Sequence, residues 1–422
     1  MASQANADVV ALQLEKVRDK LPQLYENDDT FLSMAQKRGE VETVSSRNMR
    51  IPLQLLPGGK GSGVSMDGGD LGLGGATKYD VAQVSPIFFK WGVQINKLVE
   101  YATNSSEKAI ENAAKREVKN GMRNFRQFLD QLCQTNGNGV LGTVSSVASN
   151  VLTMSVPYGA ANVIDQNDYN IVDSGLTTTR GAVTVTSHDP TTAQTITLAA
   201  NAPAGTTATD LLVDKFVDPS GSGNTVSLFG IKYHQNNATT GTWLNLNRAT
   251  YPQQLQTARV NANSSALVPS FVRLAVNKVR LGLGADAIKQ AKPIAYMHLR
   301  QSHAWENIGT VISQVILNQV QGSGQPDALP GTPREMGTFP ITEAIHADQT
   351  RIDFLTMAHW GRAVMQDIDY YKTGTQTIFP VYGASGGVAA SYLFYFVTGF
   401  QLFVDNPRAG AFIDSLASPA GY

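Results

Sequence analysis

Apolar side chains occupy every second position in two segments near the start of the chain. The first segment, 47–55, carries Met49, Ile51, Leu53 and Leu55, and the second, 87–96, carries Ile87, Phe89, Trp91, Val93 and Ile95. Period-two alternation is typical of a β-strand that buries one face. We therefore predict that residues 47–96 form one long β-hairpin with these two segments as its arms.

The tip of this predicted hairpin is unusually rich in glycine. Nine of the nineteen residues in 57–75 are glycine, the residue that loses the most backbone entropy on ordering. An isolated two-stranded ribbon is marginally stable in water, and roughly 20 extended residues span about 65 Å. We expect a neighbouring subunit to cover the hairpin, and we expect 57–75 to become ordered only in an assembly.

A long helix is predicted over about 105–134. Apolar residues recur there at three- and four-residue steps, at Ile110, Ala114, Val118, Met122, Phe125, Leu129 and Leu132. Asn104 and Glu107 resemble a capping box, and the sequence NGNG (136–139) ends the helix. Its Lys and Arg residues, Arg123 among them, indicate a solvated face, with a face toward nucleic acid as the alternative.

The segment that precedes the hairpin, 1–46, is too short to own a core and is interpreted as an N-terminal arm. A loose apolar face over 6–39 favours helix, although Pro22 interrupts it. Asp29 or Thr30 is expected to cap a short helix that runs from Phe31 to Lys37.

Composition changes at 140–226, which is rich in Thr, Ser, Asn, Ala and Gly. Short apolar runs at 151–156, 181–187, 194–199 and 211–217 predict strands of a small barrel or sandwich. Asn138–Gly139 and Ser220–Gly223 are expected to be hinges. We interpret 140–226 as an inserted β domain that could be excised without touching the rest of the chain.

The remaining sequence predicts a mixed α/β body. A helix is expected from Ser264 or Ser265, with the apolar face Leu267, Phe271, Leu274, Val279 and Ile288. A buried strand is expected at 293–299, a helix at 302–317 and a mobile loop at 321–337. Strands are expected to alternate with turns over 338–404, followed by a small polar tail after Pro407.

Length and charge narrow the classes of protein. A chain of 422 residues is expected to form two or three domains. Charged residues make up 16%, below the typical value of about 25%, which indicates a surface covered by other copies or, alternatively, a secreted β protein. The net charge of −1 gives no broad basic footprint for nucleic acid. The start MASQANADVV lacks the features of a signal peptide, and no run of about 20 apolar residues exists, so folding in the cytosol and no membrane contact are expected.

Candidate chemistry is sparse, so neither an enzyme nor a cofactor or metal site is predicted. GGKGSG (58–63) lacks the spacing of a phosphate-binding loop. His298 and His303 lie five residues apart, and His346 and His359 are placed on strands without matching ligands. The single cysteine, Cys133, is expected to be buried and inert. Asp367 and Asp369 could pair as acids, but turn amides or a lysine are the expected partners.

The order of these elements resembles the Hong Kong 97 (HK97)-like major capsid proteins of tailed bacteriophages. The text VETVSSRNMRIPLQLLPGGKGSG, followed by MDGGDLGLGGATKYDVAQVSPIFF, is similar to the extended loop of that family, and RVNANSSALVPSFVRLAVNKV is similar to its peripheral-domain return. The resemblance implies an α+β fold with an N-terminal arm (1–46), an extended loop (47–96) and a spine helix (97–139). The inserted domain (140–226) precedes a continued peripheral domain (227–300), an axial domain with return strands (301–404) and a C-terminal tail (405–422).

The resemblance also implies a structural role. Copies would form hexamers and pentamers of an icosahedral shell around double-stranded DNA, with portal, scaffolding and decoration proteins as partners, in the virion after synthesis in the host cytoplasm. Inter-subunit contacts are expected at Arg47, Arg50, Lys60, Asp67, Asp70 and Lys78 of the extended loop. The spine-helix core is expected at Ile110, Val118, Met122, Phe125 and Leu129. Lys60 is expected to stay exposed and uncross-linked. The alternatives are a secreted β-rich glycan-active enzyme and a phage tail or adhesin component.

Overall fold

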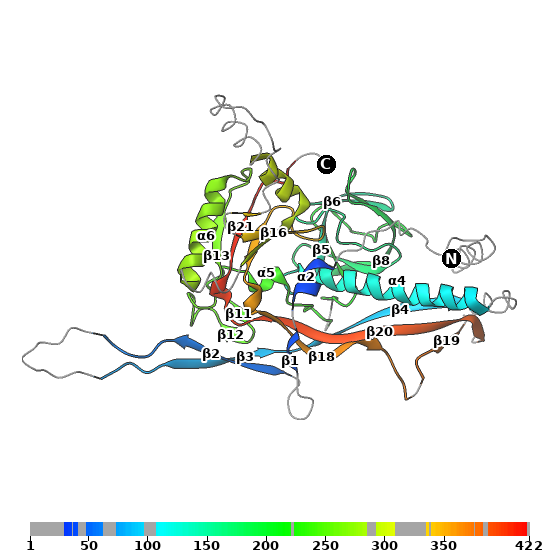
Figure 1. Ribbon diagram of the computed structural model, residues 1–422. Coiled ribbons are helices and arrows are strands. Elements are labelled where there is room, and N and C mark those ends of the chain that lie inside the picture. The colour runs from blue at the N-terminus through cyan, green and yellow to red at the C-terminus, as the bar shows by residue number, and fades with distance from the viewer. Residues whose placement is uncertain are drawn as a thin grey trace, which may run out of the picture.

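The structure is a computed structural model. It describes residues 29–35, 37–40, 48–61, 73–96, 107–220, 223–284, 293–308, 335–336, 339–374, 376–382 and 387–419. Within these residues the chain forms a long helix over an open sheet, a second sheet with its own helix, a closed barrel and a projecting hairpin (Figure 1).

The first sheet is organised around β20 (Val388–Val404). β4 (Ile87–Asn96) pairs with one edge of β20, and β18 (Trp360–Tyr370) and β19 (Phe379–Tyr382) pair with the other. β1 (Lys37–Glu40) adds a parallel strand beside β18. The helix α4 (Glu107–Cys133) lies along one face of this sheet, as Figure 1 shows, and confirms the predicted long helix.

The N-terminal segment joins this layer through a shorter helix than predicted. α2 (Thr30–Met34) ends at Met34, so the expectation of helix as far as Lys37 is wrong. Residues from Lys37 onward instead gain backbone hydrogen bonds by pairing with β18. The carboxylate of Asp130 accepts a hydrogen bond from the backbone N–H of Leu32 over 2.7 Å, which ties α2 to α4. The predicted helix before residue 29 lies outside the described residues.

The second sheet has six strands in the order β13 (Ala258–Asn261), β21 (Ala411–Asp414), β17 (Ile352–Leu355), β14 (Ile294–His298), β16 (Phe339–Ala344) and β15 (Glu335–Met336). The predicted buried strand at 293–299 is confirmed as β14. β21 is buried between two other strands, so the expectation of a small polar tail after Pro407 is wrong for 411–414. A described helical segment, 299–308, follows β14.

The helix α6 (Pro269–Leu283) covers this second sheet but differs from the prediction at its start and on its buried face. Ser264 has a φ of 59°, which a helix does not accommodate, and the helix begins with Pro269 in its first turn. Val272, Ala275, Val276 and Val279 are the buried residues. Leu274 is 46% exposed and does not belong to the core, contrary to the predicted apolar face.

The segment 140–226 contains a closed barrel. Its strands follow one another around the ring as β10 (Leu211–Asp214), β5 (Val140–Ala148), β6 (Val151–Ser155), β9 (Thr195–Leu198), β8 (Thr179–Asp189) and β7 (Asp168–Val172). Closure by antiparallel pairing of β7 with β10 leaves the barrel no open edge. Of the two predicted architectures, barrel and sandwich, the segment adopts the barrel. The boundaries of 140–226 as a separate domain stay a prediction.

The barrel is fastened to the body by hydrogen bonds and an ion pair, and the expectation that 140–226 can be excised without affecting the rest of the chain stays a prediction. The hydroxyl of Tyr158, in the loop after β6, donates to the carbonyl of Gln134 just beyond α4 (2.8 Å). The backbone N–H of Gln349 donates to the carbonyl of Pro157 (2.9 Å). The ammonium of Lys232 lies 2.6 Å from the Asp348 carboxylate and 4.2 Å from the centre of the Tyr158 ring. The barrel interior also continues into the core beneath α4.

Candidate inter-subunit surface

The projecting hairpin is built from β2 (Met49–Leu56) and β3 (Lys78–Val84). The predicted second arm, 87–96, is therefore wrong for the hairpin, because that segment is β4 and pairs with β20. Phe89 of β4 is buried in the core under α4, whereas the small Ala82 of β3 is fully buried against the hairpin's own support. Pro86 lies between β3 and β4 and cannot continue a ladder of backbone hydrogen bonds.

The base of the hairpin is anchored by its inner face. Ile51 and Leu55 of β2 face the same apolar cluster as Ala82 and Val84 of β3, which confirms the alternation predicted for the first arm. Trp243 of β11 (Thr242–Trp243) is fully buried in this cluster, and β12 (Leu246–Asn247) pairs with β11 beneath the strands. The body therefore holds the base of the hairpin, while its far end extends away from the body (Figure 1).

The histidine that packs beneath the hairpin, His234, is held in its neutral form. His234, at the end of α5 (Ile231–His234), accepts a hydrogen bond at Nδ1 from the indole N–H of Trp243 and donates from Nε2 to the carbonyl of Leu402, each over 3.2 Å. Burial lowers the pKa of His234 to about 3. The imidazole is therefore neutral at physiological pH, and both of its nitrogens serve the packing beneath the hairpin.

The hairpin carries three of the predicted contact residues within the described part of the chain. Arg50 lies opposite Gln83, Lys78 lies opposite Leu56, and Lys60 follows where the hairpin turns toward its tip; all three of these basic side chains are exposed. Arg47, Asp67 and Asp70 lie outside the described residues, so their predicted contacts stay predictions.

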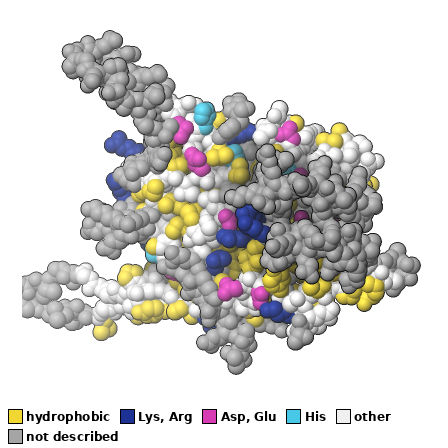
Figure 2. Space-filling view, turned by 45° about the vertical axis from the view of Figure 1, so that its right-hand side comes forward, with side chains coloured by type: hydrophobic (Ala, Val, Ile, Leu, Met, Phe, Trp, Pro, Cys, Tyr) yellow, Lys and Arg dark blue, Asp and Glu magenta, His cyan; other side chains and the backbone are white. Residues whose placement is uncertain are grey.

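Exposed apolar side chains join these basic residues on the hairpin, and sequence reasoning missed them. Tyr79 is 68% exposed, Val81 is 39% exposed and Leu73, toward the tip, is 90% exposed. Figure 2 shows hydrophobic side chains along the described part of the hairpin. The sequence KYDVAQV of β3 has no contrast between a polar and an apolar face, so its outward side could not be recognised.

The helix α4 supports this layer with the predicted core. Phe125 and Leu129 are fully buried, and Val118 and Met122 pack half-buried against the same cluster. The side chain of Ile110 lies outside the described residues. Cys133 is fully buried at the end of the helix, as expected, and burial raises the pKa of its thiol well above the ordinary value.

The described residues offer no metal centre, because no group of three or more His, Cys, Asp or Glu side chains gathers among them. His298 is buried, accepts a hydrogen bond from the backbone N–H of Arg300 (3.0 Å), and has its pKa lowered to about 4, chiefly by burial. His346 follows β16 in a turn and His359 ends a short 3₁₀ helix (Met357–His359), so their predicted placement on strands is wrong.

Of the two predicted acids Asp367 and Asp369, the second has the partners expected of a structural carboxylate. Asp369 accepts from the backbone N–H of Tyr370 (2.7 Å) and from the ammonium of Lys372 (3.0 Å). Over the described part of the chain, no helix combines the length and apolar character needed to cross a membrane.

Comparisons with known proteins find solved structures that resemble this chain but no sequence relatives. No protein-family model matches the sequence, and no curated protein matches it. The capsid asymmetric unit of cyanophage A-1(L) has a TM-score of 0.53 at 11% identity, covering 98% of this chain and 99% of that chain. The capsid of the native GTA particle has a TM-score of 0.49 at 10% identity, covering 98% and 97%. The capsid of Myoviridae phage XM1 has a TM-score of 0.43 at 9% identity, covering 96% and 97%. The likeness to the cyanophage protein shows a shared α+β capsid fold.

Proposed function

We propose that this chain is the major capsid protein of a tailed phage of the HK97-like class. In this proposal its copies form hexamers and pentamers of an icosahedral shell that encloses double-stranded DNA. The observation that carries the proposal is the hairpin: its base is packed on the body, while its far end projects away from every other described element (Figure 1). The capsid fold shared with the cyanophage protein supports the same conclusion.

The exposed surface of the hairpin requires a partner. Leu73, Tyr79 and Val81 present apolar area that a folded monomer gains nothing by exposing. A neighbouring copy that covers the hairpin would bury this area and would form charged contacts with Arg50, Lys60 and Lys78. Obligate interfaces of this kind bury about 2,000 Å² or more, and in a shell each copy would supply and receive one hairpin.

The charge balance is compatible with a genome container. The net charge of −1 means that the shell would hold DNA by enclosure, with non-specific contacts and with counterions that neutralise the phosphates. Portal and scaffolding proteins, and a decoration protein, would be partners, and the finished protein would reside in the virion after synthesis in the host cytoplasm. A structural protein of this kind uses no catalytic residue or cofactor.

The mass of the purified chain tests the proposal, and a shortened hairpin provides the decisive variant. The backbone N–H of Gly59 donates to the carbonyl of Gly75 over 2.8 Å, so residues 60–74 can be replaced by Asn-Gly without separating the strands. We expect the natural chain to form closed particles in the megadalton range. The shortened variant should keep its circular-dichroism spectrum and fail to form stable particles, whereas the control Lys119→Ala, at an exposed position of α4 outside the hairpin, should assemble.

Other masses would contradict the proposal. A monomer or small oligomer of the natural chain would favour the enzyme alternative, and rings or tubes would favour a tail component. Normal particles from the shortened variant would show that the hairpin is not the assembling element.

A further inference from the structure

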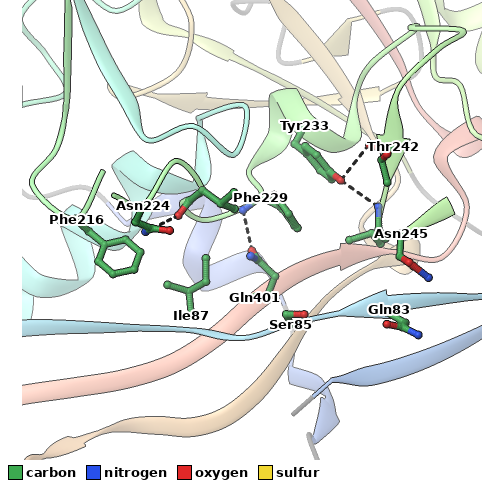
Figure 3. A pocket seen from close by; sticks show the side chains of 12 residues that line it. Gln83, Ser85, Ile87, Phe216, Asn224, Phe229, Tyr233, Thr242, Asn245 and Gln401 are labelled. Carbon is green, nitrogen blue, oxygen red and sulfur yellow. Dashed lines mark hydrogen bonds between the residues drawn. The ribbon is translucent and has the colours of Figure 1, made fainter. Parts of the chain in front are cut away.

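A cleft of about 490 Å³ opens where several separated parts of the chain meet, among them β11 with Thr242. Gln83 and Ser85 come from the base of the hairpin, Phe216 from the segment after the barrel, Tyr233 from α5, and Gln401 from β20 (Figure 3). None of the twelve side chains that line the cleft is charged. The cleft therefore suits an uncharged occupant.

Gln401 gives the cleft a directional polar group. Its Oε1 accepts hydrogen bonds from the backbone N–H groups of Phe229 (2.7 Å) and Leu402 (3.1 Å), and the first of these is drawn in Figure 3. These two donors fix which end of the amide is oxygen. The Nε2 donor of this fully buried side chain has no hydrogen-bond partner among the described residues. An oxygen acceptor that enters the cleft would satisfy it.

The rim of the cleft is apolar. Phe216 is 48% exposed and Val226 is 42% exposed, and the ring of Phe229 stacks on that of Tyr233 with their centres 4.0 Å apart. A flat, uncharged side chain with an oxygen at its end matches an apolar rim above an amide donor. Tyrosine has this combination.

Four tyrosines are exposed within the described residues, namely Tyr79, Tyr370, Tyr371 and Tyr382, and their surroundings differ. Tyr79 is flanked by Lys78 and Asp80, Tyr370 follows Asp369, and Tyr371 is followed by Lys372. Tyr382, 66% exposed at the end of β19, lies in the segment 376–382, which has no charged residue. Its strand partner on β20, Val388, is 70% exposed and adds apolar surface. Of the exposed tyrosines that the structure describes, Tyr382 is thus the one whose neighbourhood suits an uncharged cleft.

We propose that the cleft receives Tyr382, on the exposed end of β19, from a second copy of this chain. Tyr382 pairs with Val388 at the start of β20, whereas Gln401 lies thirteen residues further along that strand, about 43 Å at roughly 3.3 Å per residue, so the Tyr382 of the same copy does not reach the cleft. The phenolic oxygen would accept from Nε2 of Gln401, while Phe216 and Val226 would cover the ring. Two different surfaces meet in this contact, so it is heterologous and can close rings or extend a lattice. The inference rests on the proposed self-assembly.

Cross-linking between cysteine variants tests the contact directly. Thr242 is exposed at the cleft and Val388 is exposed beside Tyr382, whereas the native Cys133 is fully buried and leaves little background. Thr242→Cys and Val388→Cys chains, distinguished by a tag on one of them, are mixed, assembled and treated with a short bismaleimide. Electron microscopy of the same sample first establishes that particles have formed, so a failure of assembly is distinguished from a failure of this contact.

The expected product is a mixed dimer of the two variants, with no dimer from either variant alone. Particles without the mixed dimer, or a dimer from Val388→Cys alone, would overturn the proposal. Tyr382→Ala should raise the concentration needed for assembly by about tenfold or more. Thr242→Trp, which fills the cleft, should have the same effect, and the double variant should be no worse than either single variant. The matched control Tyr371→Ala should change assembly little. Equal effects of Tyr371→Ala and Tyr382→Ala would also contradict the inference.

Discussion

The ring of Trp91 on β4 lies 6.5 Å from the ring of Phe125 on α4, with 33° between their planes. Phe128, one helical turn further along α4, lies 5.8 Å from the same Trp91 ring. Aromatic contacts of this kind add to the free energy gained by burying the rings. The long helix is thereby fixed on the sheet that carries both the hairpin support and β19.

Removal of the Phe125 ring should strongly destabilise this layer. Phe125 is fully buried among other core side chains. Phe125→Ala should therefore lower the free energy of unfolding by about 3–5 kcal/mol. The control Lys119→Ala, on the exposed face of α4, should change it by no more than about 0.5 kcal/mol. Denaturant unfolding of the unassembled chains measures both, and equal values for the two variants would show that the helix orientation is wrong.

The local pattern of the sequence predicted single elements better than their pairing. Alternation located β2 and β4, and three- and four-residue spacing located α4. The pairing of β4 with β20 joins Ile87 to Phe400, more than three hundred residues apart, and no local signal specifies such a partner. The packing of Trp91 on β4 against Phe125 and Phe128 of α4 is a tertiary contact, and the hairpin arm was therefore misassigned to 87–96.

The contact surface was predictable only in part, for similar reasons. The glycine-rich tip indicated a projecting hairpin, and Arg50, Lys60 and Lys78 are exposed on it. The cleft around Gln401 is lined by side chains from segments that are distant in sequence, so no local sequence motif predicts it. The fastening of the barrel through Tyr158 was missed because one tyrosine in a loop carries no periodic signal.

The ion pair of Lys232 and Asp348, whose side chains are 19% and 10% exposed, should hold the barrel to the body. Burial alone would raise the pKa of Asp348, but the Lys232 ammonium holds it below its ordinary value. Lys232→Met would leave the carboxylate without its partner and should cost about 3–5 kcal/mol of unfolding free energy. The double variant Lys232→Met/Asp348→Leu should regain most of this loss. Thermal unfolding of the three chains tests the pair, and a double variant as unstable as the single one would contradict the assignment.

Asp214 should make the barrel less stable as the pH rises. It is buried where β10 leaves the barrel, and burial raises its pKa from 3.8 to about 6. The folded state therefore favours the protonated form, and its stabilising contribution is present below pH 4 and lost as the pH rises through 6. Asp214→Asn should be the more stable chain at pH 7.5 by about 2–3 kcal/mol, with the difference disappearing near pH 4. A difference that does not depend on pH would contradict the assignment.

His234 should act in the opposite direction beneath the hairpin. Its pKa is lowered to about 3, so the folded state favours the neutral imidazole. Its contribution is present above pH 6.5 and is lost as the pH falls toward 3, and at pH 4.5 the loss should be about 2–3 kcal/mol. Denaturant unfolding of the natural chain and of His234→Gln at pH 7.5 and pH 4.5 measures the contribution of His234 to the free energy of unfolding. Parallel changes in the two chains would show that His234 does not carry it.

A cryo-electron microscopy map of the assembled protein tests the central claim most directly. The account predicts a closed shell of five- and six-membered capsomers, in which the density of β2, β3 and their tip lies across a neighbouring copy. A small oligomer, or a shell in which each hairpin contacts only its own chain, would contradict it.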